Sequence, residues 1–221
     1  MKPAAQKAYY PLFADLTGRR CIIIGGGMVA QRKAKTLLRY GALVTVISPT
    51  LTRALAALVK RRTIAHVARR FRPSDLRGAW LVYAATNDQH INQLVYRTAN
   101  RQRIFTNVVD QKALCSFIAP AIVKRGDLVI AVSTGGSSPT VAKRLRRELE
   151  RTIGTDYAQL LRLLEGLRPI AKRRMPSYAD RKRYFSRLVA GRVFQLVRAG
   201  KTRQARREAL ALLARSATNG R

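Results

Sequence analysis

The chain is poor in acidic residues, cysteine and histidine, and it lacks long apolar runs. Its 221 residues include 11 Asp and Glu, two cysteines and two histidines. Cys21 and Cys115 lie in apolar stretches and indicate no disulfide framework. The cysteines and histidines are far apart in the sequence and do not have the spacing of a metal site, so we assign no metal. No apolar run reaches the roughly 18–20 residues of a membrane span, and residues 1–7 lack the apolar core of a secretion signal. We expect a cytoplasmic protein without a membrane segment.

Basic residues, in contrast, are abundant. The chain has 44 Lys and Arg, and its net charge is +33. So large a charge indicates a polyanionic partner. Three explanations stay open: a nucleic acid, a small polycarboxylate, or a preference of the source organism for arginine on solvated surfaces. The basic residues are spread along the whole chain, which argues against a dedicated nucleic-acid-binding arm.

A glycine-rich stretch near the N-terminus is the strongest local signal. The apolar run Cys21–Ile24 predicts a buried parallel strand, and residues 31–40 have the composition of an amphipathic helix. Between them, Gly25-x-Gly27-x-x-Ala30 fits a dinucleotide-binding fingerprint, in which a helix N-terminus holds a pyrophosphate. The alternative is a tight turn that only packs a helix on a strand.

The second predicted strand, residues 42–47, ends in Ser48-Pro49-Thr50. Many NAD-binding domains carry an acidic residue here that binds the ribose hydroxyls. In its place, we expect the hydroxyls of Ser48 and Thr50 and nearby backbone groups to hold the ribose. Because no carboxylate would repel a ribose phosphate and Arg53 follows closely, this position does not exclude NADP.

Strands and helices alternate over residues 20–110. Apolar runs predict further strands at 63–68, 80–85 and 104–109, with helices at 51–61 and 89–100. This alternation predicts an α/β fold with a Rossmann-like doubly wound parallel sheet. His66 falls in the third strand, where we expect a half-buried histidine rather than a ligand. Residues 1–19, with Tyr9–Phe13, are expected to lay an apolar segment on this domain.

The pattern changes after Asp110. Extended apolar runs at 116–120 and 128–133 predict a hairpin that turns at 124–127, followed by a helix over 139–151. Further helices are expected at 155–168, 178–190, 191–199 and 203–215, with breaks at Pro169, Pro176 and Gly200. We therefore expect three parts: a nucleotide-binding domain (1–113), a small segment with the hairpin and one helix (114–150), and a helical domain (151–221).

Four motifs, taken together, resemble a known family. The chain is similar to the precorrin-2 dehydrogenases, which include the N-terminal half of the fused siroheme synthase and a bifunctional dehydrogenase and ferrochelatase. The similarity covers about residues 8–150. The motifs that carry it are Ile24-Gly-Gly-Gly27-x-Val29-Ala30-x-Arg32-Lys33, Ala84-Ala-Thr86-Asn-Asp88-x-x-x-Asn92, Asn107-Val-Val-Asp110 and Val132-Ser-Thr-Gly-Gly-Ser-Ser-Pro139.

The resemblance implies a function. It implies NAD-dependent oxidation of precorrin-2 to sirohydrochlorin on the route to siroheme, and some members of the family also insert ferrous iron. It implies a homodimer whose subunits exchange the segment after the nucleotide-binding domain. Because no methyltransferase half follows residue 150, we expect a stand-alone enzyme. Precorrin-2 carries eight carboxylates, which agrees with the basic composition.

The resemblance also assigns roles to residues. It implies that Asp110 is the catalytic carboxylate, and general chemistry agrees, because the loss of a hydride must be matched by the loss of a proton to a base. The other use of such an aspartate is to stabilise a turn after a strand. The remaining expected site residues contact the cofactor or the tetrapyrrole. Those for the cofactor are Gly25, Gly27, Met28, Val29, Ser48, Pro49, Thr50 and Thr86; those for the substrate are Ser133, Gly135 and Gly136.

Three alternatives remain open at this stage. The loop Ser133–Ser138 is rich in hydroxyls and backbone N–H groups that suit a carboxylate, but the same pattern is typical of a helix cap without a ligand. The charge and the arginine-rich C-terminal helices also fit a non-catalytic nucleotide-sensing or nucleic-acid-binding protein, although no helix-turn-helix signature is present. A third hypothesis is another small NAD(P)-dependent oxidoreductase.

Overall fold

A computed structural model describes residues 8–218 of the chain, with side chains to residue 215. These residues divide into two compact units, Met1–Ala119 and Pro120–Arg221. The sequence predicted that residues 1–7 lack a secretion signal. These residues lie outside the part of the chain that the structure describes. None of the helices that the structure describes is long and apolar enough to cross a membrane.

The first unit is built on a parallel sheet of five strands in the order β3-β2-β1-β4-β5. The chain starts at the centre of the sheet and adds strands first on one side and then on the other, which is the doubly wound arrangement that the sequence predicted. The strands are β1 (Arg20–Ile24), β2 (Leu43–Ile47), β3 (Ala65–Val67), β4 (Leu81–Ala84) and β5 (Phe105–Val108).

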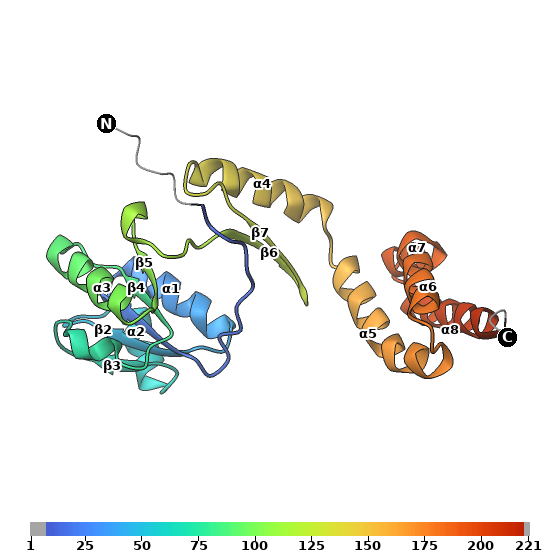
Figure 1. Ribbon diagram of the computed structural model, residues 1–221, viewed down its shortest axis with the longest axis horizontal. Coiled ribbons are helices and arrows are strands. Elements are labelled where there is room, and N and C mark those ends of the chain that lie inside the picture. Colours follow the sequence, from blue (N-terminus) through green and yellow to red (C-terminus); the bar gives the residue numbers. More distant parts are fainter. Residues whose placement is uncertain (1–7, 219–221) are drawn as a thin grey trace. The chain divides into compact units, whose positions relative to one another are not determined.

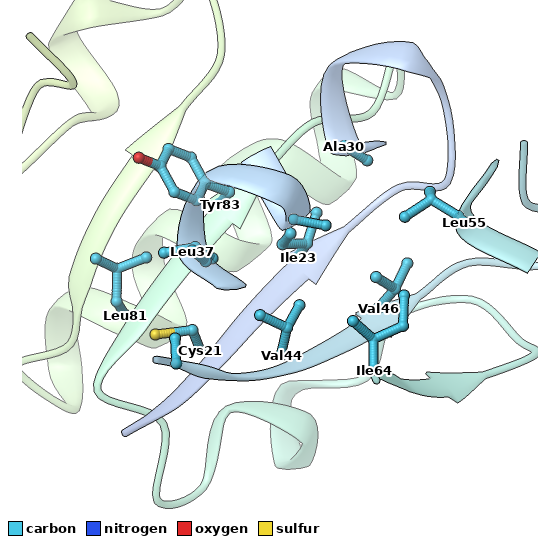
Figure 2. Close-up of a cluster of buried hydrophobic side chains, with 12 residues drawn as sticks. Cys21, Ile23, Ala30, Leu37, Val44, Val46, Leu55, Ile64, Leu81 and Tyr83 are labelled. Carbon is cyan, nitrogen blue, oxygen red and sulfur yellow. The ribbon is translucent and has the colours of Figure 1, made fainter. Parts of the chain in front are cut away.

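Helices cover both faces of this sheet (Figure 1). On one face, α1 (Met28–Arg39) and α2 (Arg53–Lys60) pack on alternate residues of the strands, as the cluster in Figure 2 shows. On the other face, α3 (Gln89–Arg101) and the short helix η1 (Pro73–Leu76) pack on the intervening residues. Because both faces are buried, the central strands are almost continuously apolar. After β5 comes the short helix η2 (Lys112–Leu114).

The second unit begins with an antiparallel pair, β6 (Ala121–Arg125) and β7 (Leu128–Val132), against which α4 (Pro139–Thr152) packs. Arg125 donates to the carbonyl oxygens of Ile153 and Glu150 at 3.0 Å, and so ties β6 to the end of α4. The last helices share one apolar core. They are α5 (Asp156–Arg174), α6 (Tyr178–Ala190), α7 (Arg192–Arg198) and α8 (Thr202–Thr218).

Three expectations about local structure were wrong. The first strand of the hairpin is Ala121–Arg125, because residues 116–120 instead bond back to β5 through the N–H groups of Ser116 and Phe117. Pro169 does not end a helix: it lies inside α5, where burial of Leu167 and Ala171 offsets the roughly 3 kcal/mol that an interior proline costs. The expectation that the N-terminal segment lies on the domain was wrong for Tyr10 and Phe13, which are 85% and 75% exposed, whereas Leu16 of the same segment packs against the core.

Candidate functional site

The parallel strands of the first unit end together at one edge of the sheet. Ile24 is the register partner of both Ile47 and Ala84, and Ala84 is the partner of Val108. The loops that follow these strands therefore meet at this edge, where ligands bind in doubly wound folds. These loops and the first residues of α1 carry the expected site residues of the first unit. These are Gly25, Gly27, Met28, Val29, Ser48, Pro49, Thr50, Thr86 and Asp110.

The glycine turn leaves no room for side chains at two positions. Gly25 has a φ of +112°, and a Cβ there would lie 2.3 Å from the carbonyl oxygen of Ala85. A Cβ on Gly26 would lie 1.8 Å from the carbonyl oxygen of Thr50. Around Gly27, by contrast, there is open space. The fingerprint pointed to Gly25 and Gly27, and it missed Gly26, whose close contact comes from another loop.

Helix α1 starts without a side-chain cap. Its N-cap is Gly27, which offers no side-chain acceptor, and its first turn contains no acidic residue. The other two α-helices of this unit are capped, α2 by Thr52 and α3 by Asp88. Met28 is 69% exposed beside this uncapped start. An uncapped helix start presents free N–H groups and the positive end of the helix dipole, so the turn fits a pyrophosphate.

The loop after β2 lies against the glycine turn. Ser48 is 7% exposed, and its carbonyl oxygen lies 2.9 Å from Nε2 of His66, which must carry the hydrogen because a carbonyl only accepts. Thr52 donates its backbone N–H to the carbonyl of Gly26 at 2.9 Å and its hydroxyl to Gln31 at 2.8 Å. Pro49 and Thr50 are exposed between these anchors. His66 is partly buried in β3 and serves to hold this loop.

The loop after β4 is fixed by hydrogen bonds to α3. The hydroxyl of Thr86 donates to Oδ1 of Asn92 at 3.0 Å, and the side-chain amide of Asn92 donates back to the carbonyl of Thr86 at 3.1 Å. Asn92 is 2% exposed. Asp88 caps α3 by accepting from the backbone N–H groups of His90 and Ile91 at 3.0 and 3.1 Å. Asn92 therefore holds the loop after β4 in place at this edge of the sheet.

Asp110 stands two residues after β5, in an exposed turn. Its φ of +60° is unusual for a residue other than glycine, and the turn is held from several sides. The thiol of Cys115 reaches the carbonyl oxygens of Val108 at 3.2 Å and of Gln111 at 3.3 Å, one on each side of Asp110. The amide of Asn107 donates to the carbonyl of Phe117 at 3.0 Å. Asp110 therefore lies in a braced turn that follows β5 at this edge of the sheet.

The expected substrate residues belong to the second unit. Gly135 and Gly136 have φ values of +62° and +84°, and the N–H of Gly135 donates to the hydroxyl of Ser133 at 3.1 Å. Ser138 caps α4 by accepting from the N–H of Val141 at 3.2 Å. Ser133 and Gly136 are exposed. The helix-cap alternative is thus correct for Ser138, while the N–H of Gly135 is already bonded and Gly136 is exposed.

The described residues contain no group of three or more His, Cys, Asp or Glu side chains that is arranged to hold a metal ion. Lys33 on α1 is partly buried. Burial lowers the pKa of Lys33 and the charge of Arg32 lowers it further, whereas Cys115 and Asp110 act in the opposite direction.

Comparison with known families extends this description over most of the chain. Residues 12–121 match a family described as putative NAD(P)-binding. Residues 125–152 match the sirohaem biosynthesis protein central region, and residues 156–213 match the sirohaem synthase dimerisation region. The first match agrees with the uncapped helix and the glycine turn, and supports NAD as the cofactor.

Individual relatives agree with these matches. The chain is 42% identical to a siroheme synthase of Thioalkalivibrio sulfidiphilus over 198 residues, which are 90% of this chain and 40% of that protein. It is 35% identical to a siroheme synthase of Photobacterium profundum over 212 residues, 96% of this chain and 45% of that one. The chain thus spans less than half the length of these curated relatives.

A solved structure described as SirC, precorrin-2 dehydrogenase, matches most of the chain. It superimposes with a TM-score of 0.77 at 26% sequence identity, and the match covers 92% of this chain and 100% of that one. The predicted fold class, with a Rossmann-like sheet, a dimerisation segment and a helical region, is thereby confirmed. The chain belongs to the family of the precorrin-2 dehydrogenases and siroheme synthases, as its motifs predicted.

Proposed function

We propose that this protein is an NAD-dependent precorrin-2 dehydrogenase that forms sirohydrochlorin in siroheme biosynthesis. The observation that carries the proposal is the edge of the sheet where the uncapped start of α1 follows β1 and the exposed Asp110 follows β5, the two strands on either side of β4. The likeness to a solved precorrin-2 dehydrogenase over the whole of that chain supports it.

Each part of this edge has a proposed role. The N–H groups of Gly27, Met28 and Val29 bind the pyrophosphate, while Gly25 and Gly26 allow the backbone to approach it. Ser48, Pro49 and Thr50 line the adenosine end, and Thr86 lies toward the nicotinamide end. Bound NAD⁺ accepts a hydride. Asp110, as general base, takes the proton that precorrin-2 loses in the same oxidation.

The charge of the protein suits the substrate. Precorrin-2 carries eight carboxylates, and a chain with a net charge of +33 attracts such an anion at long range. We propose that Ser133, Gly135 and Gly136 bind one of these carboxylates through the hydroxyl and the exposed backbone. Charge-assisted hydrogen bonds of this kind are about twice as strong as neutral ones.

Asp110→Asn tests the proposal. We expect purified protein with precorrin-2 and NAD⁺ to form NADH, measured by absorbance, and we expect Asp110→Asn to lower kcat about 100- to 10,000-fold because the amide cannot accept the proton. The matched control is Asp15→Asn, an exposed carboxylate before β1 and therefore at the opposite end of that strand. Full activity of Asp110→Asn would contradict the assignment of the base. No NADH formation, together with salt-dependent DNA binding, would favour the nucleic-acid alternative.

Iron insertion is a further reaction that we propose to test at the same site. Ferrous iron would be a substrate, and it needs only transient contact while the pyrrole nitrogens lose their protons to a base such as Asp110. Adding ferrous iron after the dehydrogenation and following the absorbance of the macrocycle separates the two activities. If iron enters at the same rate with and without the protein, this part of the proposal fails.

We also propose a homodimer in the cytoplasm, with three functional parts at 1–113, 114–150 and 151–221. The match of residues 156–213 to a dimerisation region supports the dimer, and light scattering should give twice the mass of one chain. The alternation of strands and helices stops after β5, and in the part of the chain that the structure describes only helices follow residue 155. Burial raises the pKa of the Cys21 thiol to about 11, and both cysteines are buried, which suits a reducing compartment.

A further inference from the structure

Asp110 has a backbone conformation that its place in the fold does not explain. Three non-glycine residues of the described part of the chain have a positive φ, namely Arg62, Arg103 and Asp110. Arg62 and Arg103 directly follow the C-caps of α2 and α3, where a left-handed residue commonly ends a helix. Asp110 follows a strand instead, so no helix end accounts for its φ of +60°. Left-handed residues of this kind persist only where their surroundings hold them, and they concentrate at functional sites.

The turn that carries Asp110 runs from Val108 to Gln111. The backbone N–H of Gln111 donates to the carbonyl of Val108 at 3.2 Å and closes the turn, with Asp110 as its third residue. A turn with a positive φ at its third residue usually has glycine or asparagine there. A carboxylate at this position therefore costs backbone free energy, which other contacts must offset.

The segment 115–117 folds back along β5 and supports this turn. The backbone N–H of Ser116 donates to the carbonyl of Thr106 at 2.8 Å, and the hydroxyl of Ser116 accepts from the N–H of Thr106 at 2.7 Å. One residue further along β5, the side-chain amide of Asn107 donates to the carbonyl of Phe117 at 3.0 Å. These bonds fix the segment on the strand that leads into the turn.

Within this segment, Cys115 reaches both ends of the turn. Its buried thiol lies 3.2 Å from the carbonyl oxygen of Val108, the first residue of the turn, and 3.3 Å from that of Gln111, the last. A thiol has one hydrogen, so the two carbonyls share it or receive it in turn. Both carbonyls also accept a backbone N–H, Val108 from Gln111 and Gln111 from Leu114 at 3.0 Å. The thiol therefore adds to a turn that is already closed, and ties both its ends to one buried side chain.

We propose that Cys115 is a positioning residue for the dehydrogenation, because its thiol ties both ends of the 108–111 turn and so keeps Asp110 in the left-handed conformation in which its carboxylate acts as the base. The proposal rests on the proposed function, in which Asp110 is the base. In this role the thiol touches neither substrate nor cofactor and undergoes no chemical change. It acts only through the backbone of the turn.

Two substitutions at position 115 separate hydrogen bonding from packing. Cys115→Ser keeps a hydrogen-bond donor, whereas Cys115→Val keeps an apolar side chain of similar size and has no donor. With precorrin-2 and NAD⁺ as substrates, we expect Cys115→Val to lower kcat about tenfold with little change in the KM for NAD⁺, because a small misplacement of the base slows the reaction. Cys115→Ser should retain most of the rate. Cys21→Val, the same change at the other buried cysteine, is the matched control and should keep the kcat of the wild type.

A second measurement needs no substrate. The NMR coupling between the amide proton and the α proton of Asp110 reports its φ. We expect this coupling to shift in Cys115→Val and to stay at the wild-type value in Cys115→Ser and Cys21→Val. This arm succeeds or fails whether or not the protein oxidises precorrin-2, so it is distinguishable from a failure of the proposed function.

Three results would overturn the proposal. They are a Cys115→Val protein with the kcat of the wild type, an Asp110 coupling that is the same in Cys115→Val and the wild type, and equal losses of kcat in Cys115→Ser and Cys115→Val. Thermal unfolding checks that each variant is folded at the assay temperature. If Cys115→Val does not fold, Cys115→Ala, which also lacks a donor, takes its place with the same expected results.

Discussion

The two glycine-containing turns of this protein each lead into a helix, but they are built differently. The turn before α1 has no side-chain cap, and two of its glycines are pressed against carbonyl groups of other loops. The turn before α4 is capped by the hydroxyl of Ser138, and a Cβ on Gly135 would meet nothing within 4 Å. The first turn therefore leaves its N–H groups for a ligand, whereas the second satisfies its own helix and leaves only its glycine backbone exposed.

This difference shows that glycine content alone does not identify a phosphate site. What distinguishes the first turn is a close backbone approach combined with the absence of a capping hydroxyl. In the second turn, the hydroxyl of Thr134 donates to the carbonyl of Ser138 and accepts from its N–H, both at 3.0 Å. The comparison yields three predictions, from the largest effect to the smallest.

Gly26→Ala should have the largest effect. Its methyl group would lie 1.8 Å from the carbonyl oxygen of Thr50, so the loop after β2 has to move. We expect NADH affinity, measured by fluorescence titration, to fall about 100-fold, and stability to fall by about 1–3 kcal/mol from overpacking. Gly27→Ala is the matched control, because the same methyl group there meets open space and φ is −82°. Equal losses in the two variants would show that packing does not distinguish these glycines.

Gly27→Asp tests the uncapped helix start directly. The extended backbone of Gly27, with ψ of −170°, suits an N-cap residue, so an aspartate there should bond to the first N–H groups of α1. We expect a stability gain of a few tenths of a kcal/mol and an NADH affinity about tenfold lower or worse, since the carboxylate takes the place of the pyrophosphate. Calorimetry measures both quantities. Unchanged affinity would place the pyrophosphate elsewhere.

Ser138→Ala should have the smallest effect and should act on the other turn. Removing the hydroxyl leaves the N–H of Val141 without its cap, which costs about 1 kcal/mol of stability in thermal unfolding. NADH affinity should not change. Ser137→Ala is the control, because Ser137 is exposed and its contribution to the turn is a backbone N–H bond to the carbonyl of Thr134. A drop in NADH affinity with Ser138→Ala would contradict the separation of the two turns.

The sequence predicted the strands and helices of the first unit well because buried parallel strands and amphipathic helices leave strong periodic patterns. Cys21–Ile24 and Trp80–Ala85 are such runs, and Asp88 at the start of α3 is a strong capping signal. Prediction from the sequence failed where contacts with residues distant in sequence decide the local structure. Pro169 continues a helix because its neighbours are buried in the core of the second unit, and no local signal shows this.

The residues of the candidate site also fall into two groups, those that the sequence predicted and those that only the structure identified. The catalytic assignment of Asp110 and the roles of the expected cofactor and substrate residues stay predictions, although the residues of the first unit do lie in loops at one edge of the sheet. Gly26, Asn92 and Lys33 are not among the expected site residues, although the motifs include all three. Their contacts are with Thr50, Thr86 and Tyr83, residues that are brought near by the sheet and not by the chain.

By itself, the sequence determined the class of fold, the order of its elements and the family, because these depend on local periodicity and on short motifs. The tertiary structure alone decided which groups at the sheet edge are already bonded and which are free. A helix start becomes a ligand site only if no neighbouring hydroxyl reaches it, and a glycine such as Gly26 leaves no room for a side chain only because a loop distant in sequence packs against it.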